Sequence, residues 1–142
     1  MRKILIALTA AAALPAMQAQ AHVTVDPAQA APHAYIRAAL RVGHGCGTAA
    51  TTRLTVRLPE GVTGARPMSK PGWTIVLTPR EGAAPAGGHG SAPEVATITW
   101  EGGKLPNEYY DEFVLRFRAP NEPGATLWFQ VRQECEGGAV TD

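Results

Sequence analysis

Thr52-Arg53-Leu54-Thr55-Val56-Arg57-Leu58 is the stretch that decides the fold, because its apolar residues alternate strictly with polar ones. A period of two predicts a β-strand with one face buried in a core and the other face in water. Pro59-Glu60-Gly61 follows directly and has the residue types of a turn. The pattern therefore predicts short strands that are joined by turns and cover a core on one side.

The same alternation recurs on both sides of this stretch, and no segment shows the period of an amphipathic helix. The Gly-, Ala-, Pro- and Ser-rich residues 80–93, which include His89, predict a hairpin loop, and Gly102-Gly103 predicts another tight reversal. About seven strands spaced in this way predict an all-β, immunoglobulin-like antiparallel β-sandwich. The other predicted strands are residues 22–25, 34–42, 73–77, 95–100, 113–118 and 126–132.

Residues 1–21 have the pattern of a secretory signal peptide. Met1-Arg2-Lys3 precedes an apolar, alanine-rich run that is shorter than the roughly 20 residues of a membrane span. Ala19-Gln20-Ala21 has the small residues of a cleavage site, so cleavage there would leave His22 at the mature N-terminus. We therefore expect one domain at residues 22–142, a periplasmic or otherwise extracytoplasmic location, and no membrane anchor in this chain.

The charge of the expected mature chain is close to neutral. Removing Arg2 and Lys3 lowers the 13 Lys and Arg residues to 11, against 12 Asp and Glu residues. Charges of both signs are scattered, without the basic stripe that binds nucleic acid or the polybasic patch that binds a lipid surface. Neither nucleic acid nor a membrane surface is therefore an expected partner.

The chain contains two cysteines, Cys46 and Cys135. Each lies near the end of a predicted strand, and an extracytoplasmic compartment allows disulfides to persist, so we expect a bridge between them. The alternative is that one or both thiolates are soft ligands of a metal ion.

A histidine at a free N-terminus, as expected for His22, offers two nitrogen ligands from one residue. Its α-amine and its imidazole Nδ1 can close a six-membered chelate ring, and nitrogen donors in a planar arrangement suit Cu(II). The unperturbed pKa values of these groups, about 7.7–8.0 and about 6.5, allow a strong Lewis acid to displace both protons at neutral pH. The alternative is that His22 merely follows a cleavage site.

Seven short blocks stand in order along the chain: HVTVDP at 22–27, RVGHGC at 41–46, LPEGV at 58–62, KPGW at 70–73, WEGGKLP at 100–106, YDEF at 110–113 and QEC at 133–135. Together they resemble the YcnI-like family of exported copper-binding proteins. The resemblance implies an immunoglobulin-like sandwich, Cu(II) bound by the amine and imidazole of His22, and copper trafficking rather than catalysis. Other members add a glutamate from the second strand and a tryptophan near the C-terminus, and neither has a counterpart here.

Another residue must then complete the site, and topology suggests His44. If the first two strands are antiparallel neighbours, the start of the first lies beside the end of the second, where Gly43-His44-Gly45-Cys46 follows. His44 is therefore the candidate third ligand, and Cys46 could join it only outside a disulfide. The alternative is that His44 bonds to the adjoining loop and that the two glycines serve turn geometry alone.

These patterns favour an exported carrier that binds one Cu(II) ion and passes it to another copper-handling protein in the same compartment. A copper-dependent oxidative enzyme with an N-terminal histidine brace is a second interpretation, and a metal-free interaction module is a third. The sequence has no nucleophile elbow, phosphate loop or catalytic cysteine–histidine spacing, so we expect no enzymatic activity.

Several other residues have expected structural roles. Asp111 and Glu112 are adjacent carboxylates that we expect at a solvated strand end rather than in an acid–base pair. His33 follows Pro32 in an expected surface turn. Tryptophans are expected to pack in the core or on a sheet face, and the chain has three: Trp73, Trp100 and Trp128.

Overall fold

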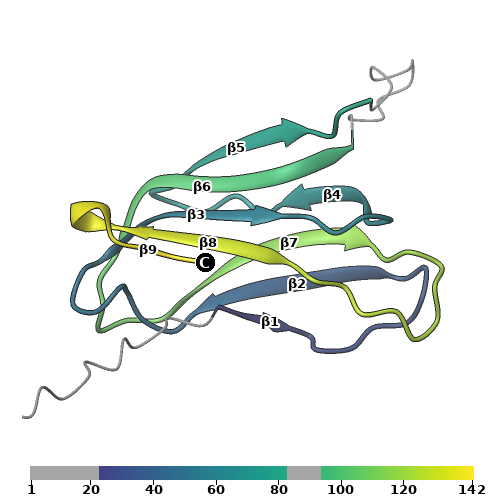
Figure 1. The fold of residues 1–142 in the computed structure, drawn as a ribbon, viewed down its shortest axis with the longest axis horizontal. Helices are drawn as coiled ribbons and strands as arrows, with labels where there is room; N and C mark the ends of the chain where they lie inside the picture. Colours follow the sequence, from purple (N-terminus) through teal and green to yellow (C-terminus); the bar gives the residue numbers. More distant parts are fainter. Residues whose placement is uncertain (1–22, 83–93) are drawn as a thin grey trace, which may run out of the picture.

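The computed structural model describes residues 23–82 and 94–142, which form two antiparallel sheets packed face to face (Figure 1). One sheet has the strand order β1-β2-β7-β4, and the other has the order β5-β6-β3-β8-β9. The predicted all-β sandwich is confirmed, with nine strands in the described ranges. The elements are β1 (Thr24–Asp26), β2 (Tyr35–Val42), β3 (Thr51–Arg57), β4 (Thr63–Pro67), β5 (Thr74–Pro79), β6 (Val95–Leu105), β7 (Asp111–Arg118), β8 (Gln130–Cys135), the 3-10 helix η1 (Glu136–Gly138) and β9 (Val140–Thr141).

Strand β3 contains most of the stretch that predicts the fold, and its alternation decides which side chains enter the core. Leu54 and Val56 are fully buried, whereas Arg53 on the opposite face lies in water. Trp100 of β6 and Phe113 of β7 meet between the two sheets, with ring centroids 5.5 Å apart. Burial of each large apolar side chain contributes about 1.5–3 kcal/mol, so these rings are a main source of stability.

The pairing of β1 with β2 sets the position of the N-terminal end of the domain. Thr24 lies opposite Arg41, and Asp26 lies opposite Ala39, so the start of β1 is beside the end of β2. This confirms the antiparallel neighbourhood of the first two strands. The loop that follows β2 therefore lies at the same end of the sheet as Val23, the first described residue.

The pair Gly102-Gly103 does not reverse the chain, so that prediction is wrong. Strand β6 runs through both residues, and its register with β3 shifts at this point because β6 contains a bulge. Gly102 has a φ of 79°, which favours glycine, and a Cβ on Gly103 would overlap the indole of Trp73. The reversal comes later, where the Tyr109 amide donates to the Pro106 carbonyl at 3.1 Å.

The segment before β8 also differs from its prediction. The strand begins at Gln130 instead of Thr126, and Trp128 is 79% exposed instead of packed. The other two tryptophans behave as expected, since Trp100 is fully buried and Trp73 packs against the core cluster.

Two strands were not predicted. Strand β4 contains Gly64 and ends at Pro67, and β9 has only two residues, so neither shows a clear period of two. No helix within residues 23–82 and 94–142 is long and apolar enough to cross a membrane.

Candidate metal centre

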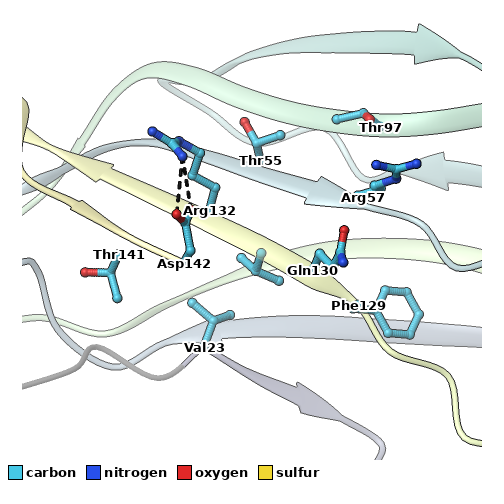
Figure 2. Close-up of a pocket in the computed structure, with 10 residues that line it drawn as sticks. Val23, Thr55, Arg57, Thr97, Phe129, Gln130, Arg132, Thr141 and Asp142 are labelled. Atoms are coloured by element: carbon cyan, nitrogen blue, oxygen red, sulfur yellow. Dashed lines mark hydrogen bonds and ion pairs between the residues drawn. The ribbon is translucent and has the colours of Figure 1, made fainter.

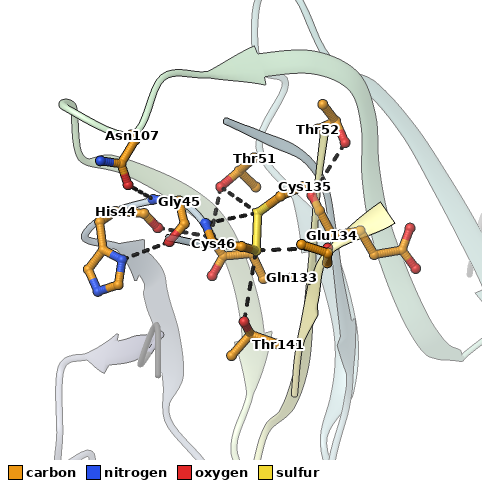
Figure 3. The surroundings of a disulfide bond; sticks show 11 residues. His44, Gly45, Cys46, Thr51, Thr52, Asn107, Gln133, Glu134, Cys135 and Thr141 are labelled. Atoms are coloured by element: carbon orange, nitrogen blue, oxygen red, sulfur yellow. Dashed lines mark hydrogen bonds between the residues drawn. A yellow bond between two sulfur atoms is a disulfide. The ribbon is translucent and has the colours of Figure 1, made fainter. Parts of the chain in front are cut away.

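Three segments meet at the end of the sandwich where β2 ends (Figure 3). They are the β2–β3 loop with His44, the β6–β7 loop with Asn107, and the end of β8 with η1. The Gly45 amide donates to Asn107 Oδ1 at 3.1 Å, and the Glu136 amide donates to the Ala50 carbonyl at 2.9 Å. Segments far apart in the sequence thus hold the loop that carries the candidate ligand.

Cys46 and Cys135 form the expected disulfide, with Cα atoms 6.0 Å apart across 89 residues of sequence. The bond joins the β2–β3 loop to the end of β8. The Cys46 amide also donates to Cys135 Sγ at 3.1 Å. Because both sulfur atoms are used in the bond, the alternative prediction of thiolate ligands does not hold for the oxidised protein.

The imidazole of His44 is half-buried and has one nitrogen already engaged. Its Nδ1 lies 2.7 Å from the carbonyl oxygen of Gly45. A carbonyl oxygen only accepts hydrogen bonds, so Nδ1 donates and carries the proton. In the neutral ring the lone pair is then on Nε2, which is the arrangement that metal-binding histidines commonly have.

Gly45 has no room for a side chain, because a Cβ at this position would overlap the carbonyl oxygen of Ala49. The amides of Cys46 and Ala49 each donate to the other residue's carbonyl at 3.1 Å, which closes a tight turn around this contact. A Cβ on Gly43 would meet nothing within 4 Å. Of the two glycines that flank His44, only Gly45 is thus required for steric reasons, and His44 lies two residues before the Cys46–Ala49 turn.

Gln133 was not predicted as part of this site. Its side chain is 1% exposed, and its Nε2 donates to the His44 carbonyl at 2.9 Å and to Thr51 Oγ1 at 2.7 Å. The sequence contains a weak signal for it, since Gln133 is a polar residue at an inward position of β8. Its partner His44 is 89 residues away, so the contact could not be predicted from spacing.

The carboxylates of the nearby strands are engaged with cations. Lys70 Nζ lies 2.6 Å from Asp111 Oδ2, and Arg41 Nη2 lies 3.0 Å from Glu112 Oε1. Glu112 raises the pKa of the Arg41 guanidinium, first through their side-chain hydrogen bond and then through its charge. Neither carboxylate has the surroundings of a general acid or base, and both lie at the start of β7, as expected for a strand end.

A cavity of about 650 Å³ opens beside Val23, at the start of β1 (Figure 2). Thr141 and Asp142 also line it, as does Arg132, whose Nη1 donates to both Asp142 carboxylate oxygens at 3.3 Å. A carboxylate, paired with a guanidinium, and Val23, the first described residue, thus line the same cavity.

The predicted site residues fall into two groups. His44, Cys46 and Cys135 lie together at one end of the sandwich, whereas His22, the predicted signal peptide and His89 lie outside the described residues. His33 is an exposed turn residue, as expected, and its Nδ1 lies 3.2 Å from Arg118 Nη2.

The described residues do not form a complete metal site by themselves. Among residues 23–82 and 94–142, no group of three or more His, Cys, Asp and Glu side chains is arranged to hold a metal ion. They supply the Nε2 atom of His44, which is a suitable nitrogen donor for Cu(II). The described residues thus offer one nitrogen donor that suits a copper ion, and any further ligands would have to come from outside them.

Comparison with known proteins gives the family. The model of a domain of unknown function, DUF1775, matches residues 22–142. The chain belongs to the DUF1775 family. A crystal structure of an uncharacterized protein from Nocardia farcinica, described as having an immunoglobulin-like fold, is similar to this chain with 29% identity and a TM-score of 0.65. The similarity covers 84% of this chain and 81% of that one, whereas no curated protein matches.

DUF1775 is a family commonly named YcnI-like, so the resemblance found in the sequence is confirmed at the level of the family. The Nocardia farcinica structure confirms the immunoglobulin-like fold. Neither description names a metal ion or another ligand.

Proposed function

We propose that this DUF1775 protein is an exported copper carrier. One Cu(II) ion is held by the α-amine and imidazole of His22, with Nε2 of His44 as a further ligand. The observation that carries the proposal is the geometry of His44: its Nδ1 is engaged by the Gly45 carbonyl, and its Nε2 has no hydrogen-bond partner among the described residues, so it can offer its lone pair to a metal. The seven blocks of resemblance to YcnI-like proteins support the choice of copper.

The topology supports the pairing of these two histidines. His44 lies three residues beyond Arg41, which pairs with Thr24, so the His44 loop and the start of β1 share one end of the sheet. His22 is bonded to Val23 at that end, and Cα atoms of neighbouring residues are about 3.8 Å apart. The proposed ligand from the N-terminus and the one from the β2–β3 loop therefore belong to segments at the same end of the sheet.

A carrier role suits a site of this kind. Nitrogen ligands satisfy Cu(II), and an ion bound at a chain end can pass to a partner without opening the hydrophobic core. Export by the predicted signal peptide would create the free α-amine and place the protein beside other copper-handling proteins outside the cytoplasm.

Competition titration with a calibrated Cu(II) chelator tests the proposal on protein that begins at His22. His22→Ala should abolish tight binding, and His44→Ala should weaken it about tenfold, the scale of losing one supporting group at a metal. His33→Asn is the matched control, because His33 is exposed in the turn before β2 and its φ of 60° is tolerated by asparagine. It should bind like wild type.

Two results would overturn the proposal. The first is wild-type affinity in the His22→Ala variant, and the second is a loss in His33→Asn as large as that in His44→Ala. Addition of peroxide and a reductant to the copper-loaded protein separates a carrier from an oxidative enzyme. A carrier should show no turnover of a polysaccharide or small phenol above that of free copper.

A further inference from the structure

Gln133 and Thr51 are the two buried polar residues within residues 23–82 and 94–142, and the side chain of Gln133 ends in an amide. Gln133 lies opposite Leu54 on the inner face of β8. Inward-facing positions of a strand in a sandwich usually carry apolar side chains. Its Oε1 has no hydrogen-bond partner among the described residues. Because burying an unpartnered polar atom is unfavourable, packing alone does not explain a glutamine at this position.

The nitrogen of this amide makes two directed hydrogen bonds. Nε2 donates to the His44 carbonyl at 2.9 Å and to Thr51 Oγ1 at 2.7 Å. The carbonyl only accepts, so the atom that faces it must be the nitrogen, and the orientation of the amide is determined. Both N–H groups of Gln133 are therefore directed at the two ends of the β2–β3 loop.

The first of these bonds acts on a peptide group that is also held at its other end. The His44 carbonyl accepts from Gln133, and the Gly45 amide of the same peptide bond donates to Asn107 Oδ1 at 3.1 Å (Figure 3). A peptide group is planar, so holding both its oxygen and its nitrogen fixes the orientation of the plane. That plane is attached directly to the Cα of His44.

We infer that Gln133 is a positioning residue for the copper ligand His44, acting with Asn107 as a clamp on the His44–Gly45 peptide group. The clamp fixes the direction in which the His44 side chain leaves the backbone, and the Gly45 carbonyl then fixes the rotation of the ring. The disulfide holds Cys46, two residues further on, but does not touch this peptide plane. The inference rests on the proposed function, because it concerns a ligand of the proposed site.

A double-mutant cycle tests the clamp. Gln133→Met keeps the length of the side chain and removes both donors, and it is measured alone and together with His44→Ala by Cu(II) competition titration. Gln133→Met alone should lower the Cu(II) affinity about tenfold. In the His44→Ala background, Gln133→Met should cause no further loss of affinity. Gln130→Met is the matched control, since Gln130 is an exposed glutamine on the same strand, and it should bind like wild type.

A metal-free measurement gives an independent readout. In Gln133→Met, the NMR signals of the His44 ring and of the Gly45 amide should broaden or split, and the Gly45 amide should exchange faster with solvent.

If Gln133→Met does not fold, Asn107→Ala replaces it, because Asn107→Ala removes the other half of the clamp and lies in a loop outside the core. That variant should lose about threefold or more in affinity, again only when His44 is present.

The outcomes separate the clamp from the proposed function. If His44→Ala binds copper like wild type, the ligand assignment is wrong and the clamp has no metal ligand to position. If His44→Ala is impaired but the clamp variant binds normally, the positioning role alone is overturned. An equal loss in the presence and absence of His44 also overturns it, because a purely structural role predicts that result.

Discussion

A histidine nitrogen binds a metal ion only when it carries no proton. In this protein the Gly45 carbonyl holds the proton of His44 on Nδ1, and the proposed terminal residue has two further nitrogens that protons occupy in acid. At the scale of single residues, the proposed copper affinity is thus a competition between the ion and protons for the same lone pairs.

The first prediction concerns pH. Cu(II) affinity should be highest near pH 8 and should fall steeply below about pH 6, since the α-amine and imidazole have ordinary pKa values of about 7.7–8.0 and about 6.5. The sign follows from proton release, because bound copper displaces protons and a higher proton concentration opposes binding. Chelator competition from pH 5 to pH 8 measures the effect. A constant affinity over this range would be incompatible with ligation by the amine and imidazole.

Sequence alone could predict some of these residues and not others. The position of His44 at the end of the sheet where β1 begins could be predicted, because antiparallel pairing brings the end of β2 to the start of β1, whereas its role as a ligand stays a prediction. Gln133 could not, because its role depends on a hydrogen bond to a backbone carbonyl in a loop that only the folded chain brings near. The exposed Trp128 was missed because an alternating pattern does not distinguish a strand from an extended loop.

At the scale of secondary structure elements, the long strand β6 shows how glycine acts within a sheet. Gly102 adopts a positive φ in the bulge, and Gly103 leaves room for the Trp73 indole, which packs edge-to-face on Phe113 with centroids 4.9 Å apart. A pair of glycines in the sequence is compatible with both a turn and a bulge, so the partner strand decides between them.

The second prediction concerns this contact. Gly103→Ala should lower the free energy of unfolding by about 1–3 kcal/mol, because the added methyl group would displace Trp73 from the core. Urea denaturation at neutral pH measures it. The control is Gly43→Ala, where a Cβ meets nothing within 4 Å, and a change within about 0.5 kcal/mol is expected. If the two substitutions lowered the free energy of unfolding equally, the overlap with Trp73 would not be the cause of the loss in Gly103→Ala.

At the scale of the whole molecule, the disulfide is the covalent link between the β2–β3 loop and the end of β8. It joins the end of the β1-β2-β7-β4 sheet to the other sheet at the place where the candidate ligand lies. A cross-link over 89 residues removes much of the freedom of the unfolded chain, and it also limits how far His44 can move in the folded protein.

The third prediction concerns this link. The Cys46→Ala/Cys135→Ala double variant should be less stable by about 3–5 kcal/mol, measured by urea denaturation against the oxidised wild type. Intact-mass analysis after alkylation, with and without prior reduction, checks that the bond is present in the purified protein. Two alkylated thiols in the unreduced sample would contradict the disulfide, and a stability loss below about 1 kcal/mol would contradict its energetic role.

The central claim is that copper is held by the α-amine of His22, and lengthening the chain by one residue before His22 tests it most directly. The extension converts the α-amine into an amide and removes one arm of the chelate, while every side chain of the domain is retained. Chelator competition compares the extended protein with the form that begins at His22, after mass spectrometry has confirmed both N-termini. The extended protein should bind Cu(II) almost as weakly as His22→Ala, with an unchanged free energy of unfolding in the absence of metal. Binding as tight as that of the protein that begins at His22 would contradict the claim and would place the ion elsewhere.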